Sequence, residues 1–408
     1  MATQSERPLK RGEQRIVALL GIPTLALALV VTMVTTYLPV VARSFVGSTI
    51  VIGVIVGIEG VLALWLPLVV GTWSDRLRTR IGGRLPFVLA GSPVLVIGLI
   101  GMGFVQAIGG LAIAALVFFV GYFLAYEPYR ALYPDAVPEE AAGRAQGVQA
   151  LWRGAGTGLA LLGGGLLLGI GQAAPFLAVA AVFALAMGTF ALVLARRGVP
   201  DDPEEQGGGV REEAGNLVRL IRGSDALRAY LAANALWELS LGALKTFVVL
   251  YVTVQLGFSR STAALLIGGV AVVVLLAALG SGKLADRFGA TSVLRIALPI
   301  YGLGLLLPLF FTQKLIVAAS VPFLAVGGGV IMALPYALLM PLMPEDEHGA
   351  LTGFYSLSRG LGTWLGPLLG GIAISALGSY QAVWLVCSVS VLLSLWPLHH
   401  LRAACRDA

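Results

Sequence analysis

The sequence has little charge and little cysteine for its length. Only 12% of its 408 residues are Asp, Glu, Lys or Arg, whereas 58% are hydrophobic. Soluble domains carry about twice this share of charge. The composition therefore excludes a water-soluble globule and a disordered chain. Two cysteines, Cys387 in an apolar run and Cys405 in a polar tail, exclude a disulfide scaffold.

Histidine is also scarce, and the usual ATP-binding signature is missing. His348, His399 and His400 lie at the periphery of the predicted spans, so we expect neither a histidine relay nor a metal site. No Gly-x-x-x-x-Gly-Lys-Ser/Thr loop occurs, so ATP is not expected to drive the protein. We expect no enzyme activity and no cofactor other than a coupling ion, H⁺ or Na⁺. The net charge of +6 is attributed to basic loops facing anionic lipid rather than to nucleic acid.

Long apolar runs dominate the rest of the chain. A helix needs about 20 apolar residues to cross a bilayer, and these runs are too long for barrel strands. The first run follows a polar, basic start without a small-residue cleavage site, so we predict a retained helix rather than a signal peptide. The sequence predicts an all-α integral membrane protein with twelve transmembrane helices, at 14–41, 49–70, 85–106, 109–132, 146–170, 173–196, 226–255, 260–281, 292–311, 313–340, 349–373 and 377–399.

The distribution of charge predicts the orientation. With the N-terminus inside, the outer loops and adjoining helix ends hold Arg43, Arg260 and Lys314 and no acidic residue. Most other basic residues fall in the inner loops and tails. This bias predicts that both termini are cytoplasmic in a multi-pass protein of the cell membrane, surrounded by lipid.

One long connector divides the chain into six spans plus six. It opens with the acidic "PDDPEEQGGG" and continues with "VREEAGNLVRLIRG", in which Leu217, Leu220 and Ile221, with Val218 beside them, form an apolar face. This second part predicts a short helix on the inner membrane surface. The predicted domains are an N-terminal six-helix bundle (1–197), a cytoplasmic linker (198–225) and a C-terminal six-helix bundle (226–408).

The two halves share sequence at charged, Pro and Gly positions. "PYRALYP" at 128–134 matches "PYALLMP" at 335–341, and a Gly/Arg/Thr pattern at 147–165 recurs at 353–371. Each copy enters the membrane from the same side. We therefore predict parallel repeats around a central site, with alternating access by rocking of the two halves.

The loop "GTWSDRLRTRIGGRLPFVLAG" (71–91) resembles the loop between spans two and three of the major facilitator superfamily. More narrowly, it resembles the sucrose-transporter and glycoside–pentoside–hexuronide:cation symporter branch, and it departs from that pattern at Gly83. The matching residues are Asp75, Arg76, Arg80, Gly82, Arg84, Pro86 and Phe87. "EPYRALYPD" resembles the same branch through Pro128, Arg130, Ala131, Leu132 and Asp135. The second half has only the generic superfamily loop, "GSGKLADRFG" at 280–289. The resemblance implies two pseudo-symmetric bundles and secondary transport.

Another motif points toward antiporters. "GTWLGPLLGG" (362–371) resembles their G-x-x-x-G-P-x-x-G-G signature, which in those proteins lies in span five and here lies in span eleven. We interpret it mainly as close helix packing by small residues, with an antiporter meaning as the alternative.

Ionisable residues inside the predicted spans are the candidate site. An isolated charge near the middle of the bilayer costs about 2.5–3.5 kcal/mol on insertion scales, so each needs a reason. The near balance of signs suggests internal pairing around a wet cavity. The set comprises Glu59, Glu127 and Glu238 with Arg130, Arg153, Lys245 and Arg359.

Glu127 is the first candidate for proton coupling, with Glu59 as a second. Glu127 lies among aromatic residues such as Tyr126, and an approaching arginine favours its charged form. The symporter branch also places acidic residues in spans two and four. The alternative is that Glu127 and Arg130, three residues apart on one helix face, merely neutralise each other.

Arg153 and Arg359 occupy equivalent positions in the two halves. The superfamily resemblance implies that the loop aspartate of one half locks onto the other half, which predicts Asp75 with Arg359 and Asp286 with Arg153. Alternatively, Arg153 grips sugar hydroxyls, as resemblance to melibiose carriers implies, or anchors the helix at the lipid interface. The predicted cytoplasmic gate comprises Asp75, Arg76, Arg84, Arg153, Asp286, Arg287 and Arg359.

Glu238 and Lys245 lie two turns apart on one face of span seven. They are candidates for substrate contact, or else join helices without a role in transport. Trp237 offers an aromatic face for a sugar, although aromatics in helix bundles more often serve packing.

These observations predict a secondary transporter, functional as a monomer, that takes up a sugar or glycoside with protons. The alternatives are a proton-coupled antiporter that exports drugs or small metabolites, and a non-transporting receptor or assembly partner.

Overall fold

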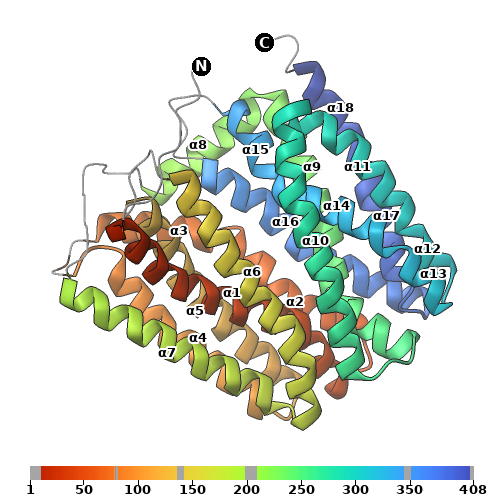
Figure 1. The fold of residues 1–408 in the computed structure, drawn as a ribbon, viewed down its shortest axis with the longest axis horizontal. Helices are drawn as coiled ribbons and strands as arrows, with labels where there is room; N and C mark the ends of the chain where they lie inside the picture. The colour runs from red at the N-terminus through yellow and green to blue at the C-terminus, as the bar shows by residue number, and fades with distance from the viewer. Residues whose placement is uncertain are drawn as a thin grey trace. The chain divides into compact units, whose positions relative to one another are not determined.

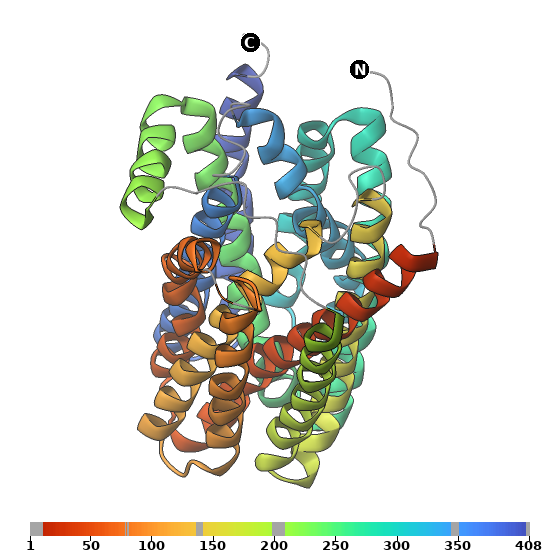
Figure 2. The same cartoon turned by 90° about the vertical axis from the view of Figure 1, so that its left-hand side faces the viewer.

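The computed structural model describes residues 11–77, 79, 81–135, 142–197, 209–343 and 351–404. Every regular element in these ranges is a helix (Figures 1 and 2). Twelve stretches are long and apolar enough to cross a membrane, which confirms the predicted number of spans and the all-α class. The side chain of Arg80 in the loop motif, and those of Leu132 and Asp135, lie outside the described set.

The helices follow the apolar runs closely. They are α1 (Arg11–Phe45), α2 (Thr49–Ala63), α3 (Leu66–Arg76), α4 (Leu85–Phe104), α5 (Ile108–Asp135), α6 (Ala142–Ile170), α7 (Ala173–Arg197), α8 (Val210–Gly223), α9 (Asp225–Leu250), the π-helix η2 (Tyr251–Gln255), α10 (Arg260–Phe288), α11 (Ala290–Gly304), α12 (Leu306–Phe310), α13 (Lys314–Ala319), α14 (Val321–Ala333), α15 (Pro335–Leu339), the 3₁₀ helix η3 (Met340–Leu342), α16 (Leu351–Leu377), α17 (Ala382–Leu393) and α18 (Leu395–Ala404).

The predicted span 313–340 is divided into several helices. Pro322 and Pro335 stand in the first turns of α14 and α15. Proline has no N–H to donate and therefore suits the start of a helix but interrupts a helix interior. The matching segment of the first half differs, because α5 continues through Pro128 without a break.

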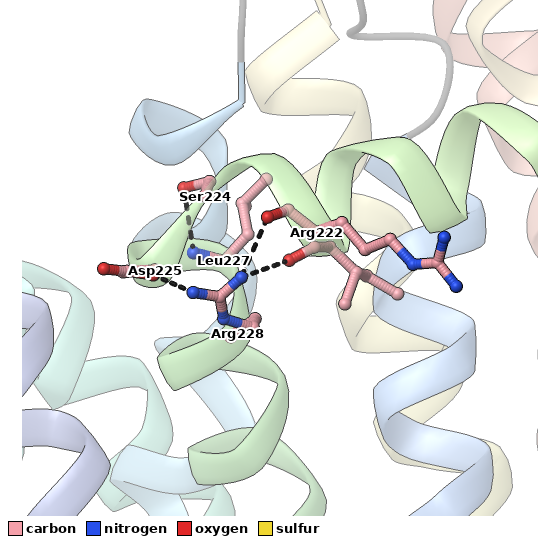
Figure 3. Close-up of polar contacts among 6 residues, drawn as sticks. Arg222, Ser224, Asp225, Leu227 and Arg228 are labelled. Carbon is pink, nitrogen blue, oxygen red and sulfur yellow. Dashed lines mark hydrogen bonds and ion pairs between the residues drawn. The ribbon is translucent and has the colours of Figure 1, made fainter.

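The connector contains the predicted short helix, α8, and a tight turn joins it to α9 (Figure 3). Ser224 caps α9 by accepting a hydrogen bond from the Leu227 N–H at 3.3 Å. Arg228 donates to the carbonyl of Arg222 at 2.9 Å and forms an ion pair with Asp225 (Figure 3). These bonds satisfy groups that a helix end leaves open, so they fix α8 to the start of α9.

The chain divides into two compact units. Unit 1 comprises Met1–Val34 and Leu66–Val210, and unit 2 comprises Thr35–Trp65 and Arg211–Ala408. The division passes through α1 and between α2 and α3. Two six-helix bundles bounded by the connector therefore remain a prediction.

In unit 2, α16 packs against both α9 and α2. On the α9 side, a Cβ at Gly362 would overlap the Cβ of Glu238, and one at Gly366 would lie 2.8 Å from the Ala243 nitrogen. On the α2 side, Gly53 and Gly60 lie against backbone atoms of the same α16 motif. Small residues let the helix backbones approach. The packing interpretation of 362–371 is confirmed.

Candidate functional site

Unit 2 holds a group of four ionisable side chains from three helices, termed here the charge cluster: Glu59 on α2, Glu238 and Lys245 on α9, and Arg359 on α16. Glu59 and Glu238 are each only 9% exposed. The charged groups that act on the Glu59 carboxyl are Arg359, Lys245 and Glu238. The sequence analysis assigned these four residues to three separate roles, and the structure brings them together.

Glycine packing positions the cluster. Gly362 of α16 abuts Glu238 of α9, and Gly57 of α2 lies beside Trp364 of α16. At the rise of an α-helix, Arg359 lies about 4–5 Å along α16 from Gly362, and Lys245 lies about 10 Å along α9 from Glu238. Close helix contact therefore places the four side chains on neighbouring segments of α2, α9 and α16, with both carboxylates buried, Arg359 half-buried and Lys245 exposed.

The cluster is electrically balanced when both carboxylates are ionised. Buried charges are costly unless they are paired, and removing one partner leaves an uncompensated charge. Protonation of one carboxylate would change the cluster from neutral to singly positive. The arrangement can therefore bind a proton or a cationic group, with each disfavouring the other.

Unit 1 contains the predicted pair on α5. The Arg130 guanidinium lies 3.2 Å from the Glu127 carboxylate, and the Glu127 side chain is 10% exposed. Arg130 also lies over the ring of Tyr126, 5.8 Å from its centroid, and Tyr126 stacks on Tyr122. The contact between Glu127 and Arg130 is confirmed, and whether the pair serves neutralisation or coupling remains a prediction.

The loop between α3 and α4 is tied together by Arg84. Its Nε lies 3.2 Å from an Asp75 carboxylate oxygen, and its Nη1 donates to the Ala131 carbonyl at 2.8 Å. The Arg76 guanidinium lies beside Gly209. Within unit 1, Asp75 thus has a nearby partner that the sequence analysis did not pair with it.

The other gate residues lie at exposed helix positions. Arg153 is exposed on α6 of unit 1. Asp286 and Arg287 are exposed near the end of α10 in unit 2, and Arg287 lies over the Phe288 ring at 5.2 Å. The predicted contacts of Asp75 with Arg359, and of Asp286 with Arg153, join residues of different units and remain predictions.

Trp237 does not present a free aromatic face. Its side chain is fully buried, and its indole N–H donates to the Ser394 hydroxyl at 2.8 Å. One turn further along α9, the Ser240 hydroxyl donates a hydrogen bond to the Cys387 carbonyl on α17 at 3.2 Å. This face of α9 packs against α17 and α18, so stacking of Trp237 on a sugar is corrected to a packing role.

The sequence analysis missed two buried polar residues that precede Glu238 on α9, Tyr230 and Asn234. Both are 0% exposed. The Asn234 amide donates to the Ser358 hydroxyl on α16 at 2.7 Å, and Tyr230 packs near the ring of Phe354. Their spacing of four residues, repeated up to Glu238, places all three on one helix face and was the available signal.

A second polar group missed by the sequence analysis lies in unit 1. The Thr24 hydroxyl is 2.6 Å from the Tyr129 hydroxyl, and Gln149 also bonds to Thr24. These bonds join α1, α5 and α6. The group has no ionisable carboxylate or cation, so it lacks the proton-binding chemistry of the charge cluster.

Metal ligation receives no support from the described residues, which contain no group of three or more His, Cys, Asp or Glu side chains suited to hold an ion.

Comparison with known proteins identifies relatives across most of the chain. The sequence profile described as Major Facilitator Superfamily matches residues 20–254 and 231–403. The chain is 25% identical over 347 residues to the "Multi-drug resistance efflux pump PmrA homolog" of Lactococcus lactis subsp. lactis (strain IL1403), covering 83% of each chain. It is 26% identical over 307 residues to "Multidrug resistance protein MdtG" of Escherichia coli (strain SMS-3-5 / SECEC), covering 72% of this chain and 73% of the relative.

Solved structures share the fold at low identity. A bacterial homolog of the human lysosomal transporter Spinster, inward-facing and occupied, gives a TM-score of 0.77 at 15% identity over 98% of both chains. The nucleoside transporter NupG gives 0.72 at 14% identity over 97% of this chain and 99% of that one. The narrower resemblance to the sucrose-transporter and glycoside–pentoside–hexuronide:cation symporter branch is not confirmed, because the relatives found are named for multidrug efflux.

Proposed function

The chain belongs to the Major Facilitator Superfamily and is a membrane transporter rather than an enzyme, and on that premise we propose that it exports small amphiphilic molecules in exchange for protons. The observation that carries the proposal is the charge cluster, in which the buried Glu59 carboxyl lies within the electrostatic influence of Arg359, Lys245 and Glu238 within unit 2. The names of two relatives that span most of the chain support export over uptake.

Competition between the proton and the substrate for the charge cluster links the movement of one to the movement of the other. With Glu59 and Glu238 ionised, the four groups sum to zero charge, and a cationic ligand competes with Lys245 and Arg359 for the two carboxylates. When a proton binds Glu59, the cluster carries one positive charge and repels that ligand. A site that holds either the proton or the substrate, and opens to one side at a time, performs antiport.

Alternating access is assigned to the two predicted bundles, 1–197 and 226–408, with both termini in the cytoplasm of the cell that carries the protein. In this scheme the loop aspartates Asp75 and Asp286 hold the inner side closed through Arg359 and Arg153. Release of these contacts opens the inner side to substrate. One copy of the chain contains the whole charge cluster, so a monomer suffices.

Proton-coupled uptake of a sugar or glycoside is the second candidate function. The observation in its favour is the loop from Asp75 to Phe87, which resembles the symporter branch, and the Glu127–Arg130 pair at 3.2 Å. In that case Glu127 would bind and release the proton, and Arg130 would orient the Glu127 carboxylate.

Transport in everted membrane vesicles separates the two functions. We expect ethidium, an amphiphilic cation, to accumulate when the vesicle interior is acidic. Glu59→Gln should reduce this accumulation at least tenfold, a change of about 1.4 kcal/mol, because a glutamine cannot take up the proton. Glu127→Gln, made in unit 1 on a paired glutamate, is the matched control and should keep most of the wild-type rate.

The opposite result would assign proton coupling to Glu127. In that result Glu127→Gln loses ethidium accumulation, whereas ethidium transport by Glu59→Gln still depends on the proton gradient. Uptake of sucrose or melibiose by right-side-out vesicles, with no ethidium movement in everted ones, would replace export by sugar uptake.

A further inference from the structure

A row of buried polar side chains leads along α9 to the charge cluster. Tyr230, Asn234 and Glu238 follow at intervals of one turn, starting five residues after the helix begins at Asp225. Facing them on α16 are Phe354, Ser358 and Gly362, each in contact with its counterpart. The two helices therefore run parallel in register, and the row lies enclosed between them.

Two atoms in this row have no hydrogen-bond partner among the described residues, the Tyr230 hydroxyl and the Asn234 side-chain carbonyl oxygen. The Asn234 amide is already used by Ser358. A buried polar group without a hydrogen-bond partner destabilises the folded state. Proteins usually satisfy such groups with bound water, and two of them one turn apart on one helix face favour an ordered water between them.

The spacing fits this arrangement. One helical turn separates the two residues by about 5.4 Å along the axis. The Tyr230 hydroxyl and the Asn234 carbonyl oxygen do not bond to each other, and side chains one turn apart on one helix face are near enough to share one bridging molecule.

The inner end of the row reaches an exposed hydroxyl. The groups acting electrostatically on Tyr230 are Tyr355, Glu238 and Tyr336. Tyr336 is 45% exposed, and its ring centroid lies 5.8 Å from that of Tyr355. At the other end of the row, Glu238 acts electrostatically on Glu59, as do Lys245 and Arg359. Electrostatic influence therefore links the exposed Tyr336, the buried Tyr230 and the buried carboxyl groups of Glu238 and Glu59.

We propose that water held by Tyr230 and Asn234 carries protons between the charge cluster and the inner end of α9. This inference rests on the proposed proton exchange. A proton leaving the Glu238 or Glu59 carboxyl passes to a water, and the Tyr230 hydroxyl accepts one proton and donates another. Asn234 only accepts a hydrogen bond from the water and positions it. Over a full transfer the carboxyl loses one proton and the solution at the inner end of α9 gains it, while the water and the Tyr230 hydroxyl return to their starting states.

Radiolytic footprinting tests the water directly. Millisecond X-ray pulses generate hydroxyl radicals from bound water, and mass spectrometry identifies the side chains oxidised. In the full chain in lipid nanodiscs, Tyr230 should be oxidised well above Tyr301, a control tyrosine that is 1% exposed and whose hydroxyl is not among the buried polar atoms without a partner. Equal, low oxidation of Tyr230 and Tyr301 would overturn the hydrated row whatever the protein transports.

Kinetics test the proton path. Tyr230→Phe and Asn234→Leu should slow proton-driven ethidium transport about tenfold, or about 1.4 kcal/mol in barrier. Ethidium counterflow moves no net proton and should stay near the wild-type rate in Tyr230→Phe, which keeps the Asn234–Ser358 bond. Tyr380→Phe removes another buried hydroxyl without a hydrogen-bond partner among the described residues, in the turn between α16 and α17, and is the matched control.

Different results would overturn the proton path and the proposed exchange of substrate for protons. Unchanged proton-driven rates in Tyr230→Phe and Asn234→Leu, with Glu59→Gln inactive, would overturn the path and leave the exchange mechanism. A wild-type protein with no proton-driven transport would overturn both.

Discussion

Asn234 donates a 2.7 Å hydrogen bond to Ser358, and this bond joins α9 to α16 one turn before Glu238. Ser358 in turn donates to the Tyr355 carbonyl of its own helix at 2.8 Å. Asn234 and Ser358 are completely buried. A polar link of this kind specifies one register between two membrane-spanning helices, and the register determines which charges meet at Glu59.

Ser358→Ala should destabilise the protein by about 1–3 kcal/mol, because it leaves the Asn234 amide buried without an acceptor. Thermal unfolding in detergent measures the effect. Ser281→Ala is the control, since the buried Ser281 hydroxyl bonds only to the Ala278 carbonyl of its own helix. Equal melting temperatures for the two variants would show that the link contributes nothing.

Gly362→Ala should lower stability by about 1–3 kcal/mol through overpacking. A Cβ there would overlap the Glu238 Cβ and would lie 2.6 Å from the Leu239 nitrogen on α9. Gly280→Ala on α10 meets no atom within 4 Å and should not reduce stability. A Gly362→Ala protein as stable as wild type would contradict the close approach of α9 and α16.

Trp237→Phe should lower stability by about 1 kcal/mol while leaving the substrate KM unchanged, because the indole N–H bonds to Ser394 rather than to substrate. Ser394→Ala should have a similar effect. The double variant should cost less than the two single losses added together. A raised KM in Trp237→Phe, with stability intact, would restore the substrate-stacking hypothesis.

Asp75→Asn and Arg359→Ala should be non-additive in transport rate if these residues form the predicted latch, with a coupling of about 0.5–3 kcal/mol. Asp286→Asn combined with Arg359→Ala is the matched pair that the latch does not link, and its effects should add. Additivity in both pairs would exclude the Asp75–Arg359 contact. Asp75 would then serve the loop through Arg84, which it contacts at 3.2 Å.

Much of the candidate site was present in the sequence as separate observations. The cost of charge in a membrane selected Glu59, Glu238, Lys245 and Arg359 without any coordinates. Their assembly into one cluster was not predictable, because it depends on α2 and α9 packing against the same helix. Periodicity within a span shows which residues share a face, but not which other span that face meets.

The Glu127–Arg130 pair, in contrast to the charge cluster, could be predicted from the sequence. A spacing of three residues on one helix is a local relationship, so the pairing of Glu127 with Arg130 followed from the sequence. Trp237 failed as a substrate contact because its orientation depends on α17 and α18, more than a hundred residues away in sequence.

The sequence alone determined the membrane class, the twelve spans and the short connector helix, since hydrocarbon thickness and backbone hydrogen bonding leave few choices for long apolar runs. Tertiary structure decided which ionisable groups share a site and which polar atoms are enclosed without partners. These properties arise from contacts between distant segments, and in lipid those contacts are set by small-residue packing and polar links rather than by hydrophobicity.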